Sequence, residues 1–263
     1  MITGRATDKD PIIEVENLTA RYGDTTVLKN VSFQVQRGEM FMMLGGSGCG
    51  KSTLLKHIIG LLKPYSGRII INGTDITSTG GEELRQVQKS IGVLFQADAL
   101  FGSMTLFENI ALPLSEYTDL SSEMIDKIVK MKLALVNLAG YENHMPAELS
   151  GGMRKRAGLA RAMALDPLLL FFDEPWAGLD PITAAELDIL IKSINDAMRT
   201  TMVIVTQELA SIFSLAERVI MLDKNARGII AEGEPKELKE HSRDPRVNNF
   251  FNRKAQGGNE GGI

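Results

Sequence analysis

Eight consecutive residues of the sequence combine glycines with a lysine and a serine in an order suited to holding phosphate. They read Gly45-Gly46-Ser47-Gly48-Cys49-Gly50-Lys51-Ser52 and fit the pattern G-x-x-x-x-G-K-[ST]. Glycines let the backbone wrap closely around an anion with its N–H groups directed inward. The lysine adds a positive charge, and the serine hydroxyl is a ligand for a divalent cation. This pattern predicts a loop that binds a phosphate chain together with Mg²⁺.

The residues on either side of this loop supply the context that such a loop needs. Met40–Leu44 is apolar on both faces, as is typical of a strand inside a parallel sheet. A helix is expected from about Lys51 to Ile59, and Gly60 ends it. Its N-terminus directs a positive dipole end at the phosphates. We therefore expect Lys51 to reach the β- and γ-phosphates of a nucleoside triphosphate, and we assign Thr53, beside Ser52, to the same site.

A pair of carboxylates follows a second buried strand. The strand Leu168–Phe172 runs directly into Asp173 and Glu174. Ligands of open α/β folds bind at the carboxyl edge of the sheet, where these side chains are expected. Asp173 suits the Mg²⁺ shell, and Glu174 suits the base that orients an attacking water. The alternative is a solvated acidic pair at a strand end, and the phosphate loop upstream favours the catalytic interpretation.

The composition excludes several classes of protein. The chain has 263 residues, of which 44% are hydrophobic and 24% charged, so it is not a disordered polymer. A net charge of -4 argues against a nucleic-acid-coating surface, and we expect no nucleic-acid partner. The single cysteine, Cys49, cannot form an internal disulfide and is expected to be a small residue that fits the loop. No signal peptide is visible, and no run approaches the roughly 18 apolar residues of a membrane span. The sequence predicts a soluble intracellular protein that reaches a membrane only through a partner.

The order of predicted elements indicates an α/β fold of one domain. Strands and helices alternate after the phosphate loop and again from Leu168 onward, which predicts a mostly parallel sheet with flanking helices. The sequence pattern between about 97 and 165 is typical of helices, so we expect a helical insert there. The predicted limits are a flexible N-terminus at 1–10, a single domain at 11–243 and a tail at 244–263 with a disordered end. The predicted strands are 11–18, 31–35, 40–44, 68–71, 91–94, 168–173, 201–206 and 218–222, and the predicted helices are 51–59, 121–138, 152–165, 182–198, 208–216 and 235–241.

Leu149-Ser150-Gly151-Gly152-Met153 adds a further motif at the start of the helix predicted from Gly152. With the phosphate loop and Asp173-Glu174 in this order, the chain resembles the ATPase subunits of ABC transporters. The resemblance implies a P-loop NTPase core with an N-terminal antiparallel β subdomain and a helical insert. It also implies a head-to-tail homodimer, in which Ser150, Gly151 and Gly152 cap the γ-phosphate of ATP held by the other copy. Taken alone, the same residues would be an ordinary helix N-cap.

Other positions correspond to the family one by one. Tyr22 lies where the family stacks an aromatic ring on adenine. Gln96 resembles the glutamine that contacts Mg²⁺ or the attacking water, and links the core to the insert. Asp180 resembles the aspartate that contacts the facing subunit, although it also fits the N-cap of the following helix. Trp176 stands where a smaller residue is common, and it suits the subunit interface and the core equally well.

One position departs from the family. Gln207 stands after the strand 201–206, where the resemblance leads us to expect a histidine bonded to the γ-phosphate. Glutamine keeps an amide donor but cannot titrate. Slower hydrolysis, a role shared with Glu174 and Gln96, an engineered change, and a non-hydrolysing ATP-binding regulatory module all remain open.

Finer similarities indicate which ABC proteins this chain is nearest. The segments Leu94–Phe101, Met131–Leu133, Met145–Met153 and Asp244–Val247 resemble the ATPases of Mla-type phospholipid systems, which work with MCE proteins. The resemblance implies membrane permease subunits, an MCE-type lipid-binding protein and accessory subunits as partners, and a peripheral location on the cytoplasmic face of the inner membrane. The alternatives are an importer ATPase for another small substrate and a soluble regulator. We expect the permease to dock near Gln96, Leu100, Phe101 and Met104, unless these residues only join insert to core.

Overall fold

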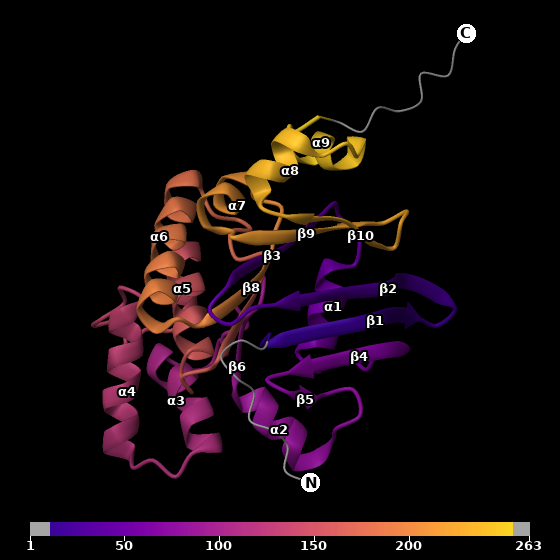
Figure 1. The fold of residues 1–263 in the computed structure, drawn as a ribbon. Coiled ribbons are helices and arrows are strands. Elements are labelled where there is room, and N and C mark those ends of the chain that lie inside the picture. The colour runs from indigo at the N-terminus through magenta and orange to yellow at the C-terminus, as the bar shows by residue number, and fades with distance from the viewer. Residues whose placement is uncertain (1–10, 255–263) are drawn as a thin grey trace.

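The fold is described from a computed structural model, which covers residues 11–254. Two sheets lie next to each other, and most helices lie on the side of the larger sheet that is turned away from the smaller one (Figure 1). The smaller sheet is antiparallel with the order β2-β1-β4-β5. Its last two strands are joined at Asn72 and Gly73, whose φ angles of 48° and 81° are those of the tight hairpin turn that Asn-Gly favours. The strands are β1 (Ile13–Tyr22), β2 (Thr25–Val35), β4 (Ser66–Ile71) and β5 (Thr74–Asp75).

The larger sheet has six strands in the order β10-β9-β3-β8-β7-β6. Its strands run parallel except β10, which pairs antiparallel with β9. The strands are β3 (Met40–Gly45), β6 (Ile91–Leu94), β7 (Leu169–Asp173), β8 (Thr201–Val205), β9 (Arg218–Asp223) and β10 (Gly228–Gly233). The order confirms the predicted α/β fold with a mostly parallel sheet and an antiparallel subdomain.

The central strand β3 divides the interior into two cores. Met40, Met42 and Leu44 face the helices, whereas Phe41 and Met43 face the antiparallel sheet. Successive side chains of a strand point to opposite faces, so a strand covered on both sides must be apolar throughout. This explains why MFMML shows no alternation in the sequence, although all five side chains are buried.

The helices fall into groups that follow the two cores. The first, α1, buries Leu54, Leu55 and Ile58 in the core shared with the antiparallel sheet. The insert consists of α3, α4 and α5, and Thr105 caps α3 through a capping box with Glu108. The helices are α1 (Lys51–Ile58), α2 (Gly81–Lys89), α3 (Leu106–Tyr117), α4 (Ser122–Leu135), α5 (Gly151–Ala162), α6 (Pro181–Met198), α7 (Leu209–Leu215), α8 (Pro235–His241) and α9 (Pro245–Phe251), with a 3₁₀ turn at Pro146–Glu148.

Several elements differ from the sequence prediction. Helix α2 was not predicted; it has no fully buried residue, and it packs only Leu84 and Val87, which are partly buried, against the core. Strand β10 was not predicted either, and the helix at α4 ends at Leu135 rather than 138, where Asn137 takes a left-handed φ of 59°. The predicted tail contains α9, which Asp244 caps through the backbone N–H of Arg246. The predicted flexible N-terminus 1–10 and the end from 255 lie outside the described residues.

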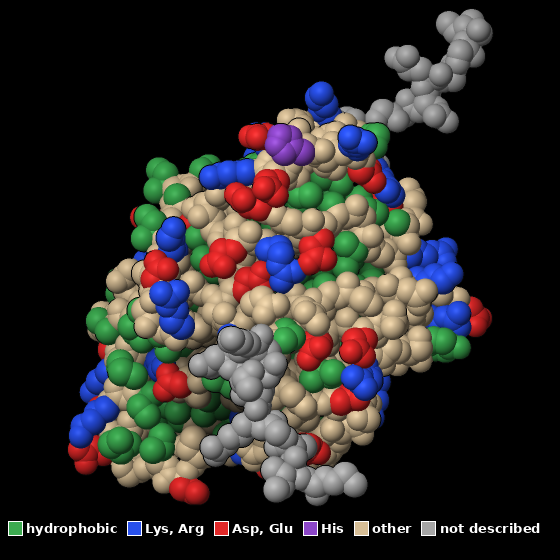
Figure 2. Space-filling view, viewed as in Figure 1, with side chains coloured by type: hydrophobic (Ala, Val, Ile, Leu, Met, Phe, Trp, Pro, Cys, Tyr) green, Lys and Arg blue, Asp and Glu red, His purple; other side chains and the backbone are tan. Residues whose placement is uncertain are grey.

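One face of the molecule shows where apolar side chains reach solvent. Hydrophobic side chains gather around the insert at the lower left of Figure 2, whereas charges of both signs alternate over much of the remaining face. Met124 and Met131 of α4 are about half exposed. Within residues 11–254, no helix combines the length and the apolar character required to cross a bilayer.

Candidate nucleotide site

The strand order of the larger sheet brings the predicted site residues together. The phosphate loop follows β3, Gln207 follows β8, Asp173 ends β7, and Gln96 follows β6. These four strands are adjacent in the order β3-β8-β7-β6 and run parallel, so their carboxyl ends form one edge. Four segments that are far apart in the sequence therefore meet at one place, as expected for an open α/β sheet.

The phosphate loop depends on glycine at two positions. Gly45 has φ 141°, and a Cβ there would lie 2.3 Å from the Leu222 carbonyl oxygen and 2.6 Å from Cys49 Sγ. Gly50 has φ 104°, and a Cβ there would lie 2.8 Å from Leu28 Cδ2. Any other residue would strain the backbone and displace its neighbours. The loop is thus held in one conformation between β3 and α1.

The Lys51 side chain folds back onto the phosphate loop. Its Nζ donates to the carbonyl oxygens of Gly45 at 2.8 Å and Gly46 at 3.3 Å, and lies 3.8 Å from Glu174 Oε1. Helix α1 begins after Gly50 with no side-chain cap and no acidic residue in its first turn. Its first N–H groups are therefore left for an anion, which the helix dipole also favours.

Ser52 and Asp173 meet although 121 residues separate them. The Ser52 hydroxyl donates to Asp173 Oδ1 over 3.0 Å. A hydroxyl, a carboxylate and the amide oxygen of Gln96 are hard oxygen donors, the kind that Mg²⁺ prefers. The donor set therefore fits the metal that the sequence predicts.

A cavity of about 510 Å³ unites most of the predicted residues. Sequence reasoning missed Val27, whose side chain carries no chemistry that a motif search would detect. Asp173 reaches the site through Ser52 rather than lining the cavity itself. The lining residues are Val27, Ser47, Gly48, Gly50, Lys51, Ser52, Thr53, Gln96, Glu174, Ala177 and Gln207.

The carboxylate of Glu174 lies between Lys51 and Gln207 in the cavity. Its backbone has a left-handed φ of 47°, and its N–H donates to the Val205 carbonyl oxygen at 2.9 Å. Burial raises the pKa of its carboxyl group, an effect that the charge of Lys51 and a hydrogen bond from Gln207 partly oppose. Because a general base works best with a pKa near the operating pH, this shift is in the direction that catalysis needs.

The remaining predicted residues lie outside this cavity. Tyr22 is 51% exposed at the end of β1 and does not line the cavity. Cys49 is buried, and burial raises the pKa of its thiol. Together with Gly46 it lines a neighbouring cavity beside α9. Trp176 is 5% exposed within the helix-side core, which supports the core alternative for this residue.

The second glycine motif opens α5. Ser150 accepts a hydrogen bond from the Met153 backbone N–H at 3.3 Å and so caps the helix. A Cβ on Gly152 would lie 2.4 Å from Thr183 Cγ2 at the start of α6. Asp180 caps α6 through the N–H groups of Ile182 and Thr183. Within one copy these residues have structural roles, and none of them lines the cavity.

The comparison with protein families agrees with this geometry. The family model described as ABC transporter matches residues 28–177, more than half of the chain. The chain belongs to this family. It is an ATP-hydrolysing subunit of a transporter, as the sequence predicted. The match runs from β2 through the phosphate loop to the segment after Glu174.

Curated relatives extend the similarity of this ABC ATPase to nearly its whole length. It is 42% identical to the intermembrane phospholipid transport system ATP-binding protein MlaF of Haemophilus influenzae, over 94% of the chain and 92% of that protein. The MlaF of Escherichia coli K12 is 39% identical over 94% of the chain and 90% of its own length. The probable ribonucleotide transport ATP-binding protein mkl of Mycobacterium tuberculosis is 45% identical over 91% of the chain and 66% of its own length.

Solved structures confirm the fold of the ABC ATPase. A dimeric post-hydrolysis state of the ATP-binding cassette MJ0796, bound to ADP and Pi, is 31% identical with a TM-score of 0.76, covering 84% of this chain and 98% of that one. The cbiO1 protein of Clostridium perfringens, part of the ABC transporter complex cbiONQ, has 29% identity and a TM-score of 0.81 over 93% and 100% of the two chains. The predicted P-loop core with β subdomain and helical insert is thus confirmed.

Proposed function

We propose that two copies of this chain bind ATP and Mg²⁺ head to tail and drive phospholipid transport by a membrane permease. The observation that carries the nucleotide chemistry is the convergence of Lys51, Ser52 and Glu174 on one cavity, with Asp173 hydrogen-bonded to Ser52. The cargo is proposed from the two MlaF relatives.

The polar residues of the site have distinct roles in this proposal. Lys51 and the N-terminus of α1 hold the phosphate chain, with the N–H groups of the phosphate loop. Glu174 orients the attacking water and accepts its proton, since its pKa is raised and it faces the cavity. Gln207 donates a hydrogen bond beside it in place of a histidine. When bound at Ser52, Asp173 and Gln96, Mg²⁺ would neutralise charge on the phosphates.

A second copy would supply the remaining contacts. Ser150–Gly152 form the N-terminus of α5, a position suited to binding an anion, but they do not line the cavity of their own chain. The ATP-binding cassette MJ0796 was solved as a dimer. Donors from both copies would then surround each γ-phosphate, with Tyr22 against adenine and Asp180 at the facing subunit. Loss of the phosphate would remove that attraction and reopen the dimer.

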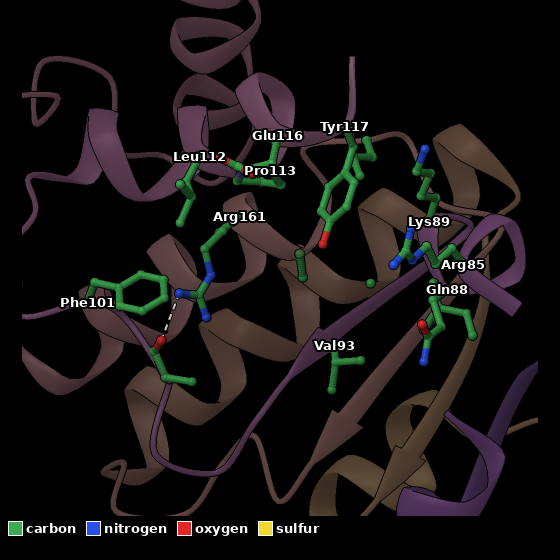
Figure 3. Close-up of a pocket in the computed structure, with 15 residues that line it drawn as sticks. Arg85, Gln88, Lys89, Val93, Phe101, Leu112, Pro113, Glu116, Tyr117 and Arg161 are labelled. Carbon is green, nitrogen blue, oxygen red and sulfur yellow. Dashed lines mark hydrogen bonds between the residues drawn. The ribbon is translucent and has the colours of Figure 1, made fainter. Parts of the chain in front are cut away.

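A groove of about 670 Å³ between the core and the insert is the proposed docking site for the permease (Figure 3). Phe101 and Tyr117 line it and are about half exposed. Of the four residues expected to dock the permease, only Phe101 lines it, whereas Leu100 packs on the core. In Figure 3 the side chains of α2, α3 and α5 surround an open centre.

The groove combines apolar rings with positive charge. The guanidinium of Arg161 lies 5.7 Å from the Phe101 ring centroid and donates to the Ala99 carbonyl oxygen at 2.7 Å (Figure 3). Lys89 Nζ lies 5.5 Å from the Tyr117 ring centroid. A short permease helix with an apolar tip and acidic flanks would match this lining. Gln96, at the start of the segment that leads to Phe101, links the groove to the cavity in this proposal.

The proposed partners and location follow the same relatives. An MCE-type lipid-binding protein and accessory subunits would complete the complex at the cytoplasmic face of the inner membrane. A second candidate cargo is a ribonucleotide, since the mkl relative is described as a probable ribonucleotide transporter. The presence of Glu174 and Gln96 in one cavity favours a hydrolysing subunit over a regulatory module without turnover.

The test is transport by the intact complex. The chain would be purified with its membrane partners and reconstituted into vesicles, and transfer of a labelled phospholipid would be followed with and without Mg-ATP. We expect ATP-dependent lipid transfer that Glu174→Gln abolishes. Transfer of a labelled ribonucleotide in place of lipid would establish the second candidate, and ATP turnover with neither cargo would overturn both.

A further inference from the structure

Glu174 and Gln207 meet in the cavity, yet they belong to different segments. Glu174 follows β7 and Gln207 follows β8. Their side chains share one hydrogen bond of 3.4 Å, long for an N–H···O contact, and the Gln207 side chain is exposed. This bond alone is too weak to fix the separation of the two groups.

A cluster of three buried polar side chains lies in the core. Two of its members follow Glu174 and Gln207 closely in the sequence. It consists of Trp176 after β7, Asp188 on α6 and Ser211 on α7, which are 5%, 8% and 1% exposed. Asp188 Oδ2 accepts a hydrogen bond from Ser211 Oγ over 3.0 Å. The indole N–H of Trp176 approaches the same carboxylate, but within residues 11–254 neither Trp176 Nε1 nor Asp188 Oδ1 makes a hydrogen bond. One carboxylate thus faces donors from both segments.

Burial of the Asp188 carboxylate costs free energy, which indicates that the direction of its hydrogen-bond acceptors has a role. The helices that carry Asp188 and Ser211 also carry Leu187, Leu190 and Ile212, which belong to the same apolar core. Burial raises the pKa of Asp188 and the charge of Glu208 adds to the rise, whereas the donors of Ser211 and Trp176 oppose it. An apolar side chain would fill this position without desolvating a carboxylate. The carboxylate offers instead two acceptors of fixed direction.

The connections from this cluster to the catalytic pair are short. Trp176 is two residues after Glu174, and Pro175 between them has a fixed φ. Ser211 is four residues after Gln207 on α7, whose N-cap is Glu208. The Glu208 backbone N–H donates to Thr206 Oγ1 at 3.0 Å, which holds the turn around Gln207. The cluster is therefore separated from Glu174 by only two residues of chain and from Gln207 by only four.

We propose that Asp188 is a positioning residue for ATP hydrolysis, which fixes Glu174 and Gln207 relative to each other by accepting a hydrogen bond from Ser211 and by facing the indole N–H of Trp176. This rests on the proposed roles of Glu174 and Gln207. The phosphate loop and Lys51 are not part of the cluster, so Asp188 acts on turnover and not on nucleotide affinity.

The test compares Asp188→Asn with Asp196→Asn, an exposed carboxylate on the same helix. Phosphate release by the complex with its membrane partners would give kcat and KM. We expect Asp188→Asn to lower kcat about tenfold, the effect of losing roughly one charge-assisted hydrogen bond, with KM for ATP changed less than about twofold. Ser211→Ala should lower kcat in the same direction, and Asp196→Asn should leave both constants unchanged.

Trp176, the single tryptophan of the sequence, reports on the cluster directly. A carboxylate beside the indole N–H shifts tryptophan emission to longer wavelength, so Asp188→Asn should shift the emission of the folded protein to shorter wavelength. An unchanged kcat with a lowered thermal midpoint would overturn the proposal, because Asp188 would then be only structural. A raised KM with normal kcat would overturn it as well. If Glu174→Gln keeps full turnover, the proposed role of Glu174 fails instead.

Discussion

Gln207 Nε2 donates to Glu174 Oε1 over 3.4 Å, so an uncharged amide faces the proposed base where the family leads us to expect a histidine. An amide keeps its donor at every pH, whereas imidazole titrates near neutrality. The relationship also joins the ends of two neighbouring strands, β7 and β8. It determines both how the site responds to pH and which substitutions should be tolerated.

Gln207→Ala should lower kcat for ATP hydrolysis by about 10- to 100-fold, as expected when one positioned donor is removed. Gln207→His should retain turnover but add a pH dependence near the titration of imidazole. Phosphate release at several pH values measures both. Gln86→Ala, an exposed amide on α2, is the matched control. Full activity of Gln207→Ala would show that the amide is dispensable.

The raised pKa of Glu174 predicts the acidic limb of the pH profile. Burial raises that pKa, and the base must be deprotonated, so kcat should fall as pH drops through a value above that of an ordinary glutamate. The hydrogen bond from Gln207 lowers the pKa, so its removal in Gln207→Ala should move the limb to higher pH. An acidic limb that stays in place or moves to lower pH in this variant is the opposite result.

Lys155 should stabilise the loop that carries Gln96. Its Nζ lies 2.9 Å from Asp98 Oδ1 and also contacts the Gln96 carbonyl oxygen, and the side chain is 4% exposed. Removing one partner of a buried ion pair leaves the other charge uncompensated, so Lys155→Met should lower the free energy of unfolding by about 3 kcal/mol. Denaturant unfolding measures the change.

Lys127 provides the comparison for that substitution. It pairs with Glu123 on the surface of α4, where both side chains are more than 60% exposed. Lys127→Met should change stability by less than about 0.5 kcal/mol. Equal losses for the two variants would mean that burial of Lys155 adds nothing to its ion pair.

The end of the described chain should contribute to stability through α9. Phe251 is 3% exposed and packs against Phe213, with ring centroids 5.7 Å apart, and Val247 is fully buried. Phe251→Ala should lower the free energy of unfolding by about 3 kcal/mol, the loss typical of a buried phenylalanine. Arg253→Ala, at an exposed neighbouring position, should be neutral. A neutral Phe251→Ala would show that α9 does not pack on the domain in solution.

Much of the site could be predicted because its residues are fixed by local chemistry. The phosphate loop requires glycines at Gly45 and Gly50 for steric reasons, and these leave a pattern that is readable without the fold. The alternation of strands and helices predicted a mostly parallel sheet with the site at its carboxyl edge, whereas the order β3-β8-β7-β6 comes from the structure.

The rest depends on contacts between distant residues. Asp188 looks like any polar residue of an amphipathic helix until Ser211 and Trp176 are placed beside it. Val27 lines the nucleotide cavity only because β2 lies next to the phosphate loop. Helix α9 is short, and its apolar residues Val247 and Phe251 show their role only when packed on α7 and α8.

The central claim is that ATP joins two copies of this chain and that hydrolysis separates them. The direct measurement is the mass in solution of Glu174→Gln, determined by sedimentation with Mg-ATP, with ADP and without nucleotide. The account predicts a dimer with Mg-ATP that Ser150→Phe disrupts, and monomers with ADP or no nucleotide. A mass that stays monomeric at saturating Mg-ATP, with binding demonstrated in the same sample, would contradict it.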